Sequence, residues 1–253
     1  MSKLGDAVAS EWTKFWSVRA TWLSLAASAV LMTAYSVMGG LVIARDGETG
    51  SVRSIAINGA FYMAQFPVIA VAALFVTSEY ASGSIRSSLL WVPVRNRLLL
   101  AKATVLLPVL FVLGAVLAGL SMVVGGVLAG AHAIPVPAGQ IVLTIAGMAA
   151  YFALLGVLCL GIGTALRSTA GTIVSVMVLL LMLPMLVGAL GANALVDYFP
   201  GFAGVNGMLP EGEMNPIFHT PTVYAPWIGT LSCAAWSVAA LVAGSVVLRK
   251  RDA

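Results

Sequence analysis

The fold is decided by residues 102–167, which read KATVLLPVLFVLGAVLAGLSMVVGGVLAGAHAIPVPAGQIVLTIAGMAAYFALLGVLCLGIGTALR. Between Lys102 and Arg167 this stretch contains no Asp, Glu, Lys or Arg. A charge at the centre of a membrane helix costs roughly 2.5–3.5 kcal/mol on insertion scales, whereas a water-facing helix gains nothing by excluding charge. The stretch therefore predicts helices that cross a bilayer.

The composition of the whole chain agrees with a membrane protein. Of its 253 residues 60% are hydrophobic and 9% are charged, against about 25% charged in soluble domains. No long polar region is left over, so residues 1–253 are expected to form a single transmembrane domain. The net charge of +4 lies at the ends of apolar segments, so no nucleic-acid partner is expected.

A transmembrane helix needs about 20 apolar residues, and six segments provide them. They are Trp22–Ala44, the segment between Arg53 and Glu79, two segments on either side of His132–Pro137, Ala170–Asn193 with a kink at Pro184, and Tyr224–Leu248. We therefore predict an all-α polytopic membrane protein with six transmembrane helices. An even number of spans puts both termini on one side of the membrane.

Residues 1–20 are predicted to form an amphipathic helix in the headgroup layer, retained rather than cleaved as a signal peptide. Apolar side chains share one helical face, and polar ones the other: Leu4, Val8, Trp12, Phe15 and Trp16 against Lys3, Asp6, Ser10, Lys14 and Ser17. The alternative is a simple helical extension of the first span.

Basic residues indicate the orientation of the chain. Of the 13 Lys and Arg, all except Arg45 and Arg53 fall in the N-terminus, the loop between the second and third spans, Arg167 or the C-terminal tail. This leaves 11 on one side and 2 on the other. The positive-inside rule then predicts that both termini are cytoplasmic.

The sequence lacks the usual inventory of a catalyst. His132 and His219 fall in outer loops, and Cys159 and Cys233 in apolar runs, where small core residues are expected. No carboxylate lies in the middle of a span, and no glycine-rich loop with Lys-Ser/Thr is present for phosphate. We therefore expect no enzyme activity and no cofactor, but a pathway that another protein drives.

The loop between the second and third spans is the most distinctive segment. Glu79 suits the N-terminus of a short cytoplasmic helix, Gly83-Ser84 allows a turn, and Pro93 would end that helix. Arg95, Arg97 and Lys102 are then expected to meet the inner headgroups. The alternative is a loop that is merely basic and sets the topology.

This pattern resembles that of type-2 ABC transporter permeases. In that family Glu, an aromatic residue, two variable residues, Gly, Thr or Ser, and an aliphatic residue precede Pro, Arg and Lys at these spacings. The segments Ser10–Lys14 and Arg19–Trp22 also resemble family members from GC-rich bacteria. Ser84 replaces the commoner Thr and keeps the hydroxyl.

The resemblance implies the permease subunit of an ATP-driven exporter in the bacterial plasma membrane. Such a subunit dimerises, with a homodimer preferred over a heterodimer, and docks two separate subunits that bind ATP and Mg. Residues 79–98 would be its coupling loop, and residues 193–222 short re-entrant helices on the outer side. The residues expected at the ATPase are Glu79, Tyr80, Gly83, Ser84, Ile85 and Arg86.

Polar and aromatic residues in the second span are candidates for the transport pathway. Asn58, Phe61, Tyr62 and Gln65 recur at about helical spacing, although the same residues could hold helices together. The mostly apolar lining favours a hydrophobic or amphipathic cargo such as a drug, lipid or natural product. Two other functions stay open: a secondary carrier or channel without an ATPase, and a non-transporting membrane anchor or assembly factor.

Overall fold

The computed structural model describes residues 4–84 and 95–250, with the backbone alone at residue 95. Within these residues there is no β-strand, and six helices are long and apolar enough to cross a membrane. The predicted all-α fold with six spans is confirmed. The spans are Arg19–Asp46 (α2), Val52–Ala81 (α3 Val52–Gly59, η1 Ala60–Ala64, α4 Gln65–Ala81), Asn96–His132 (α6 Arg95–Ala129, η2 Gly130–His132), Ala138–Leu166 (α7), Thr169–Ala189 (α8 Thr169–Met177, η3 Val178–Met182, α9 Leu183–Ala189) and Pro226–Lys250 (α12).

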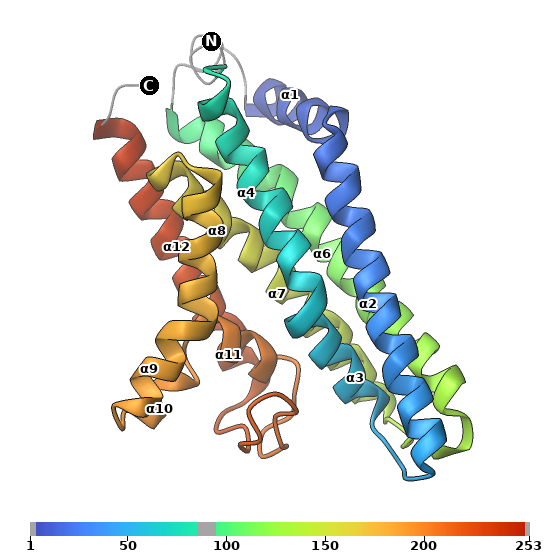
Figure 1. The fold of residues 1–253 in the computed structure, drawn as a ribbon. Helices are drawn as coiled ribbons and strands as arrows, with labels where there is room; N and C mark the ends of the chain where they lie inside the picture. Colours follow the sequence, from blue (N-terminus) through green and yellow to red (C-terminus); the bar gives the residue numbers. More distant parts are fainter. Residues whose placement is uncertain (1–3, 85–94, 251–253) are drawn as a thin grey trace.

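A separate helix, α1 (Leu4–Ser17), precedes the first span and lies across one end of the bundle (Figure 1). The chain turns at Val18, whose backbone is extended, so α1 is not an extension of α2. The indole of Trp22 donates a hydrogen bond to the carbonyl of Trp16 at 3.0 Å and fixes the corner. We call this end of the bundle, where α12 also finishes, the α1 end.

The centre of the bundle is α7, which packs against α6, α12 and α4. Small residues bring these helices close together. A Cβ placed on Gly161 of α7 would come within 2.3 Å of the backbone of Ala240 in α12, and one placed on Gly114 of α6 would meet the backbone of α7 at Met148 within 2.7 Å. Such contacts between small residues are the usual way in which helices associate in a bilayer.

The second and fifth spans both contain a turn of π-helix, at Ala60–Ala64 and at Val178–Met182. Such turns cluster at functional sites and bend the helices that contain them. In the fifth span the π turn comes just before Pro184, and α9 leans away from the axis of α8 (Figure 1). The kink expected at Pro184 is therefore present.

At the other end of the bundle, α10 (Asn193–Val196) and α11 (Pro200–Asn206) lie between the fifth and sixth spans. All residues of α11 are buried, and the helix packs against α12, α7 and η3. The amide of Asn206 donates to Asp197 Oδ1 at 3.1 Å and accepts from Asn215 at 2.7 Å. Residues 193–222 thus form two short helices and a tied loop; their re-entry into the bilayer stays a prediction.

Candidate functional site

Four charged side chains from three elements meet beneath α1. Glu11 and Lys14 come from α1, Glu79 from the last turn of α4, and Lys102 from the second turn of α6. The Nζ of Lys102 lies 2.6 Å from Oε2 of Glu11 and 2.8 Å from Oε1 of Glu79. The Nζ of Lys14 lies 2.6 Å from Oε1 of Glu11 and 3.2 Å from Oε1 of Glu79. Two carboxylates and two ammonium groups thus form one neutral ionic cluster.

Lys102 is, with Glu11, the most buried member of the ionic cluster. Its side chain and that of Glu11 are each 2% exposed. The ammonium also donates to the carbonyl of Phe75 at 3.3 Å and lies 4.3 Å from the centre of its ring. Removing one partner of such a buried pair leaves an uncompensated charge, which is strongly destabilising. The cluster is therefore a rigid joint between α1, α4 and α6.

Lys14 closes the ionic cluster on its half-exposed side. Desolvation by itself would lower the pKa of its ammonium, but the hydrogen bond and charge of Glu11, followed by those of Glu79, outweigh desolvation and raise the pKa. A raised pKa keeps this lysine charged at neutral pH. Lys14 therefore contributes a positive charge to the ionic cluster.

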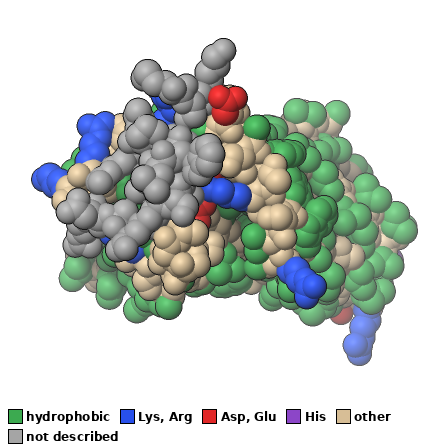
Figure 2. Space-filling view, turned by 90° about the horizontal axis from the view of Figure 1, so that it is seen from above, with side chains coloured by type: hydrophobic (Ala, Val, Ile, Leu, Met, Phe, Trp, Pro, Cys, Tyr) green, Lys and Arg blue, Asp and Glu red, His purple; other side chains and the backbone are tan. Residues whose placement is uncertain are grey.

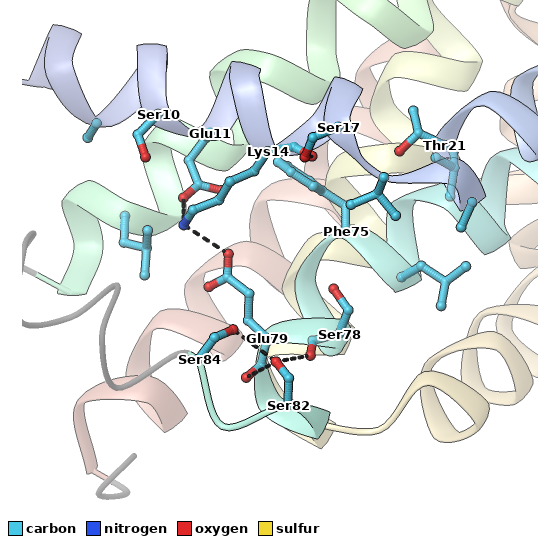
Figure 3. A pocket seen from close by; sticks show the side chains of 16 residues that line it. Ser10, Glu11, Lys14, Ser17, Thr21, Phe75, Ser78, Glu79, Ser82 and Ser84 are labelled. Atoms are coloured by element: carbon cyan, nitrogen blue, oxygen red, sulfur yellow. Dashed lines mark hydrogen bonds and ion pairs between the residues drawn. The ribbon is translucent and has the colours of Figure 1, made fainter.

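A cavity of about 870 Å³ opens beside the ionic cluster, between α1 and α4 (Figure 3). Glu11, Lys14 and Glu79 line this cavity. It is also lined by six residues with hydroxyl groups: Ser10, Ser17, Thr21, Ser78, Ser82 and Ser84. Glu79 is 8% exposed. Among the described residues its second oxygen, Oε2, has no hydrogen-bond partner. A buried carboxylate oxygen normally accepts a hydrogen bond, and the cavity beside Oε2 has room for a group that donates one.

The loop that follows α4 begins with the turn expected from the sequence. Gly83 adopts a left-handed backbone with φ of 73°, which glycine tolerates best. The hydroxyls of Ser82 and Ser84 lie 2.9 Å apart across this turn. The ring of Tyr80 packs under the guanidinium of Arg167, 5.2 Å from the ring centre. Ile85 and Arg86 of the predicted coupling loop, and its predicted short helix, lie outside the described residues.

The structure differs from the sequence prediction in how this loop is bounded. Helix α4 continues to Ala81 and α6 already begins at Arg95, so both ends of the predicted 79–98 loop are helical. Lys102 was expected among the residues that meet headgroups, but it is buried inside the bundle. The expectation for Lys102 is wrong because α6 begins about two turns before it.

Sequence reasoning also missed the role of Glu11. Its spacing of three residues from Lys14 allows an ion pair on one helical face. The inward face of α1 consists of Ala7, Glu11 and Phe15, whereas Trp12 of the predicted apolar face is half exposed. The polar residues of α1 therefore point partly into the protein and the tryptophans partly outward.

The four candidate pathway residues point in two directions. Gln65 is fully buried, and its Oε1 accepts a hydrogen bond from the hydroxyl of Tyr151 in α7 at 2.8 Å. Phe61 is buried and meets the ring of Phe218 edge-on at 5.6 Å. Tyr62, in contrast, is 45% exposed. Gln65 and Phe61 thus hold the bundle together.

Tyr62 lies on the outward side of the second span, and Asn58, four residues before it, is half-buried at the edge of that side. Phe66, which is also exposed, continues their spacing of four residues. The Oδ1 of Asn58 is buried without a hydrogen-bond partner in the described part of the chain. These three residues form one stripe, which we call the outward stripe.

A second charged contact closes the opposite end of the bundle. Arg53, at the start of α3, is buried; its guanidinium donates to Oε1 of Gln140 in α7 at 2.6 Å and to Glu213 of the segment after α11. Arg53 therefore ties three segments together. It acts as a structural clamp far from the ionic cluster.

Figure 2 looks onto the α1 end of the molecule. Lys and Arg side chains lie at its left edge, near its centre and toward the lower right, and hydrophobic side chains cover most of the surface visible on the right. This distribution is typical of a helical bundle whose charged end emerges from a bilayer.

Neither the models of known protein families nor the curated proteins searched provide a match for this chain. The features of the molecule that bear on function are therefore its own residues: the ionic cluster, the turn at Gly83 and the outward stripe.

Proposed function

We propose that this chain is the permease subunit of an ATP-driven ABC exporter. ATP and Mg are bound by separate ATPase subunits, two per complex, and the chain itself is not an enzyme. The observation that carries the proposal is the ionic cluster of Glu11, Lys14, Glu79 and Lys102. It joins the segment that resembles a coupling loop to three helices of the bundle.

The ionic cluster supports the proposal because it couples motion at the loop to the spans. Glu79 lies four residues before Gly83, in the last turn of α4, and Lys102 lies in the second turn of α6. A force applied to the loop between these helices moves both of them, and α1 follows through Glu11 and Lys14. A loop that only set the topology would need no such joint.

The transport pathway in this proposal lies between two copies of the chain. The interior of one copy is filled by packed side chains such as Gln65 and Phe61. The outward stripe of Asn58, Tyr62 and Phe66 offers an amide, a hydroxyl and aromatic faces beside a π turn. Such a lining suits a hydrophobic or amphipathic cargo better than an inorganic ion, which needs charged or carbonyl rings. A homodimer places two such stripes opposite each other.

The proposed location is the plasma membrane of a bacterium, with the α1 end in the cytoplasm. The asymmetry of 11 basic residues against 2 supports this orientation. It also places the Gly83 turn where soluble ATPase subunits can reach it.

Co-reconstitution tests the proposal directly. The purified chain is incorporated into liposomes with a candidate P-loop ATPase, sought first among the products of neighbouring genes. Uptake of fluorescent amphipathic compounds is measured with and without ATP. We expect transport only with both proteins and ATP, and a stimulation of ATP hydrolysis by the permease. An ATPase variant without its catalytic glutamate serves as the matched control.

Two results would contradict the proposal. Transport by the chain alone, driven by an ion gradient, would identify a secondary carrier or channel. Stable membrane insertion with no transport in either condition, and no association with the ATPase, would favour an anchor or assembly factor.

A further inference from the structure

The cavity between α1 and α4 has a polar end and an apolar end. The polar end contains Glu79 and the hydroxyls of Ser78 and Ser82; the apolar end contains Val71 and Leu74 of the same helix. Val71 lies eight residues before Glu79, which corresponds to about 12 Å along the helix axis. The cavity therefore runs from the level of α1 into the apolar part of the span.

The polar end lacks one hydrogen-bond donor. Oε2 of Glu79 has no partner among the described residues, although the side chain is only 10% exposed. A ligand that fits must therefore present a donor, and a primary ammonium group satisfies a carboxylate best. A quaternary ammonium group has no N–H and leaves the oxygen unsatisfied.

The charge of the ionic cluster restricts the rest of the ligand. Glu11 and Glu79 balance Lys14 and Lys102, so the cavity has no excess charge for a purely anionic group. The hydroxyls of Ser10 and Ser78 can donate to phosphate oxygens, whereas that of Ser82 already donates to the carbonyl of Ser78 at 2.8 Å. The charge of Lys14 lies close by (Figure 3). A zwitterion with an ammonium and a phosphate matches this arrangement.

We propose that this cavity binds the headgroup of a phospholipid that carries a primary ammonium, such as an ethanolamine phospholipid. The ammonium donates to Oε2 of Glu79, the phosphate accepts from the serine hydroxyls, and the start of one acyl chain follows Val71 and Leu74. A side chain from a soluble protein partner would fill the polar end but would leave the apolar end open. The inference requires only that the chain spans a bilayer, and it holds whether or not the chain is a permease.

Native mass spectrometry of the delipidated protein in detergent tests the site. Ethanolamine, choline and glycerol phospholipids with identical acyl chains are titrated separately. We expect the ethanolamine lipid to bind about tenfold more tightly than the choline lipid, the effect of one charged hydrogen bond. Equal affinity for the three headgroups would overturn the proposal.

Two variants connect this preference to the cavity. Glu79→Gln keeps an oxygen for Lys102 but removes the carboxylate, and Ser78→Phe fills the cavity without changing the ionic cluster. Both should lose the preference for ethanolamine, whereas Glu48→Gln, which changes an exposed carboxylate at the opposite end, should keep it. Retention of the preference in Glu79→Gln and Ser78→Phe would place the lipid elsewhere.

Two further experiments distinguish the lipid from other possible occupants of the cavity. Soluble phosphoethanolamine should fail to displace the lipid, because it lacks the acyl chain; complete displacement at equal concentration would make a soluble headgroup the occupant. A Ser78→Cys thiol should be protected from maleimide by the ethanolamine lipid. Protection by an ATPase subunit but not by the lipid would replace the lipid with a protein.

Discussion

The ammonium of Lys102 lies 2.6 Å from a carboxylate oxygen of Glu11, which is 91 positions away in the chain, and both side chains are 2% exposed. This contact ties α1 to the third span. The edge-on contact of Phe15 with Phe75, at 5.1 Å, adds an apolar anchor beside it. Helix α1 is therefore packed into the folded bundle and is not held by a headgroup layer alone.

Removal of the Lys102 charge should destabilise the fold. Lys102→Met leaves Glu11 and Glu79 with Lys14 as their one remaining cation in the ionic cluster, and we expect a loss of about 3–5 kcal/mol. Unfolding by a denaturing detergent, followed by circular dichroism, measures the change. The control is Arg45→Met in the exposed last turn of α2, which should change stability by less than about 0.5 kcal/mol.

A double variant checks that the loss comes from charge. Lys102→Met combined with Glu11→Gln restores the balance of charges, so its cost should be smaller than the sum of the two single costs. Strict additivity, or a Lys102→Met protein as stable as the wild type, would contradict a coupled ionic cluster.

The spans could be predicted because the exclusion of charge is a local property of the sequence. The ionic cluster could not, because it depends on where helices begin and turn. Lys102 opens the charge-free stretch and looks like a headgroup contact until α6 is seen to begin at Arg95. The headgroup helix predicted for residues 1–20 implies a corner before the first span, but its pattern does not show that Glu11 faces inward.

The candidate pathway shows the same limit. Asn58, Phe61, Tyr62 and Gln65 all have the right spacing, but the partners of each become visible only in three dimensions. Gln65 accepts a hydrogen bond from Tyr151, and Phe61 packs against the ring of Phe218. The turn at Gly83 was predictable, since it follows from the local chemistry of glycine.

The contact between Gln65 and Tyr151 should affect stability and not substrate choice. Tyr151→Phe removes the donated hydrogen bond, which in a membrane protein is worth about 0.6 kcal/mol on average and at most about 1.7. In contrast, Tyr62→Leu on the outward stripe should change which compounds stimulate ATP hydrolysis by the proposed ATPase partner. Detergent unfolding and a panel of amphipathic compounds measure the two effects. If Tyr151→Phe changed the compound profile and Tyr62→Leu changed only stability, the pathway would lie inside the bundle.

Close packing of α7 on α12 predicts a steric effect. A methyl group on Gly161 would come within 2.5 Å of the backbone at Ala240 and Leu241, so Gly161→Ala should cost about 1–3 kcal/mol. Gly119 of α6 has nothing within 4 Å, and Gly119→Ala should be neutral or stabilising by up to about 1 kcal/mol. Thermal denaturation in detergent compares the pair. Equal melting temperatures for the two variants would show that the helices are not in contact as described.

Cysteine labelling tests the orientation of the bundle. In a background with Cys159→Ala and Cys233→Ser, single cysteines replace Glu48, Glu211 and Ser84, all of which are exposed. The thiols at 48 and 211 should react with an impermeant maleimide added to whole cells, and the thiol at 84 only after lysis. Gly50 and Gly212 are unsuitable for cysteine, because a Cβ placed on Gly50 would come within 2.4 Å of Ile43 and Gly212 has a positive φ. Labelling of position 84 alone in whole cells would reverse the orientation.

The turn at Gly83 offers the sharpest test of coupling. Glu79→Ala would mix docking with folding, because Glu79 is held by Lys102 and Lys14, whereas nothing lies within 4 Å of a Cβ placed on Gly83. Gly83→Asn tolerates the left-handed backbone and serves as the control; Gly83→Trp adds a large side chain to the exposed turn. At equal expression and melting temperature, we expect Gly83→Trp to lower ATPase binding and stimulated ATP hydrolysis about tenfold. Gly83→Asn should leave both nearly unchanged. The factor of ten corresponds to roughly one charged hydrogen bond, which is lost when the bulky side chain displaces the loop from the ATPase. Pull-down of the ATPase and steady-state hydrolysis in proteoliposomes measure the two quantities. Wild-type coupling in Gly83→Trp would remove this loop from the contact with the ATPase.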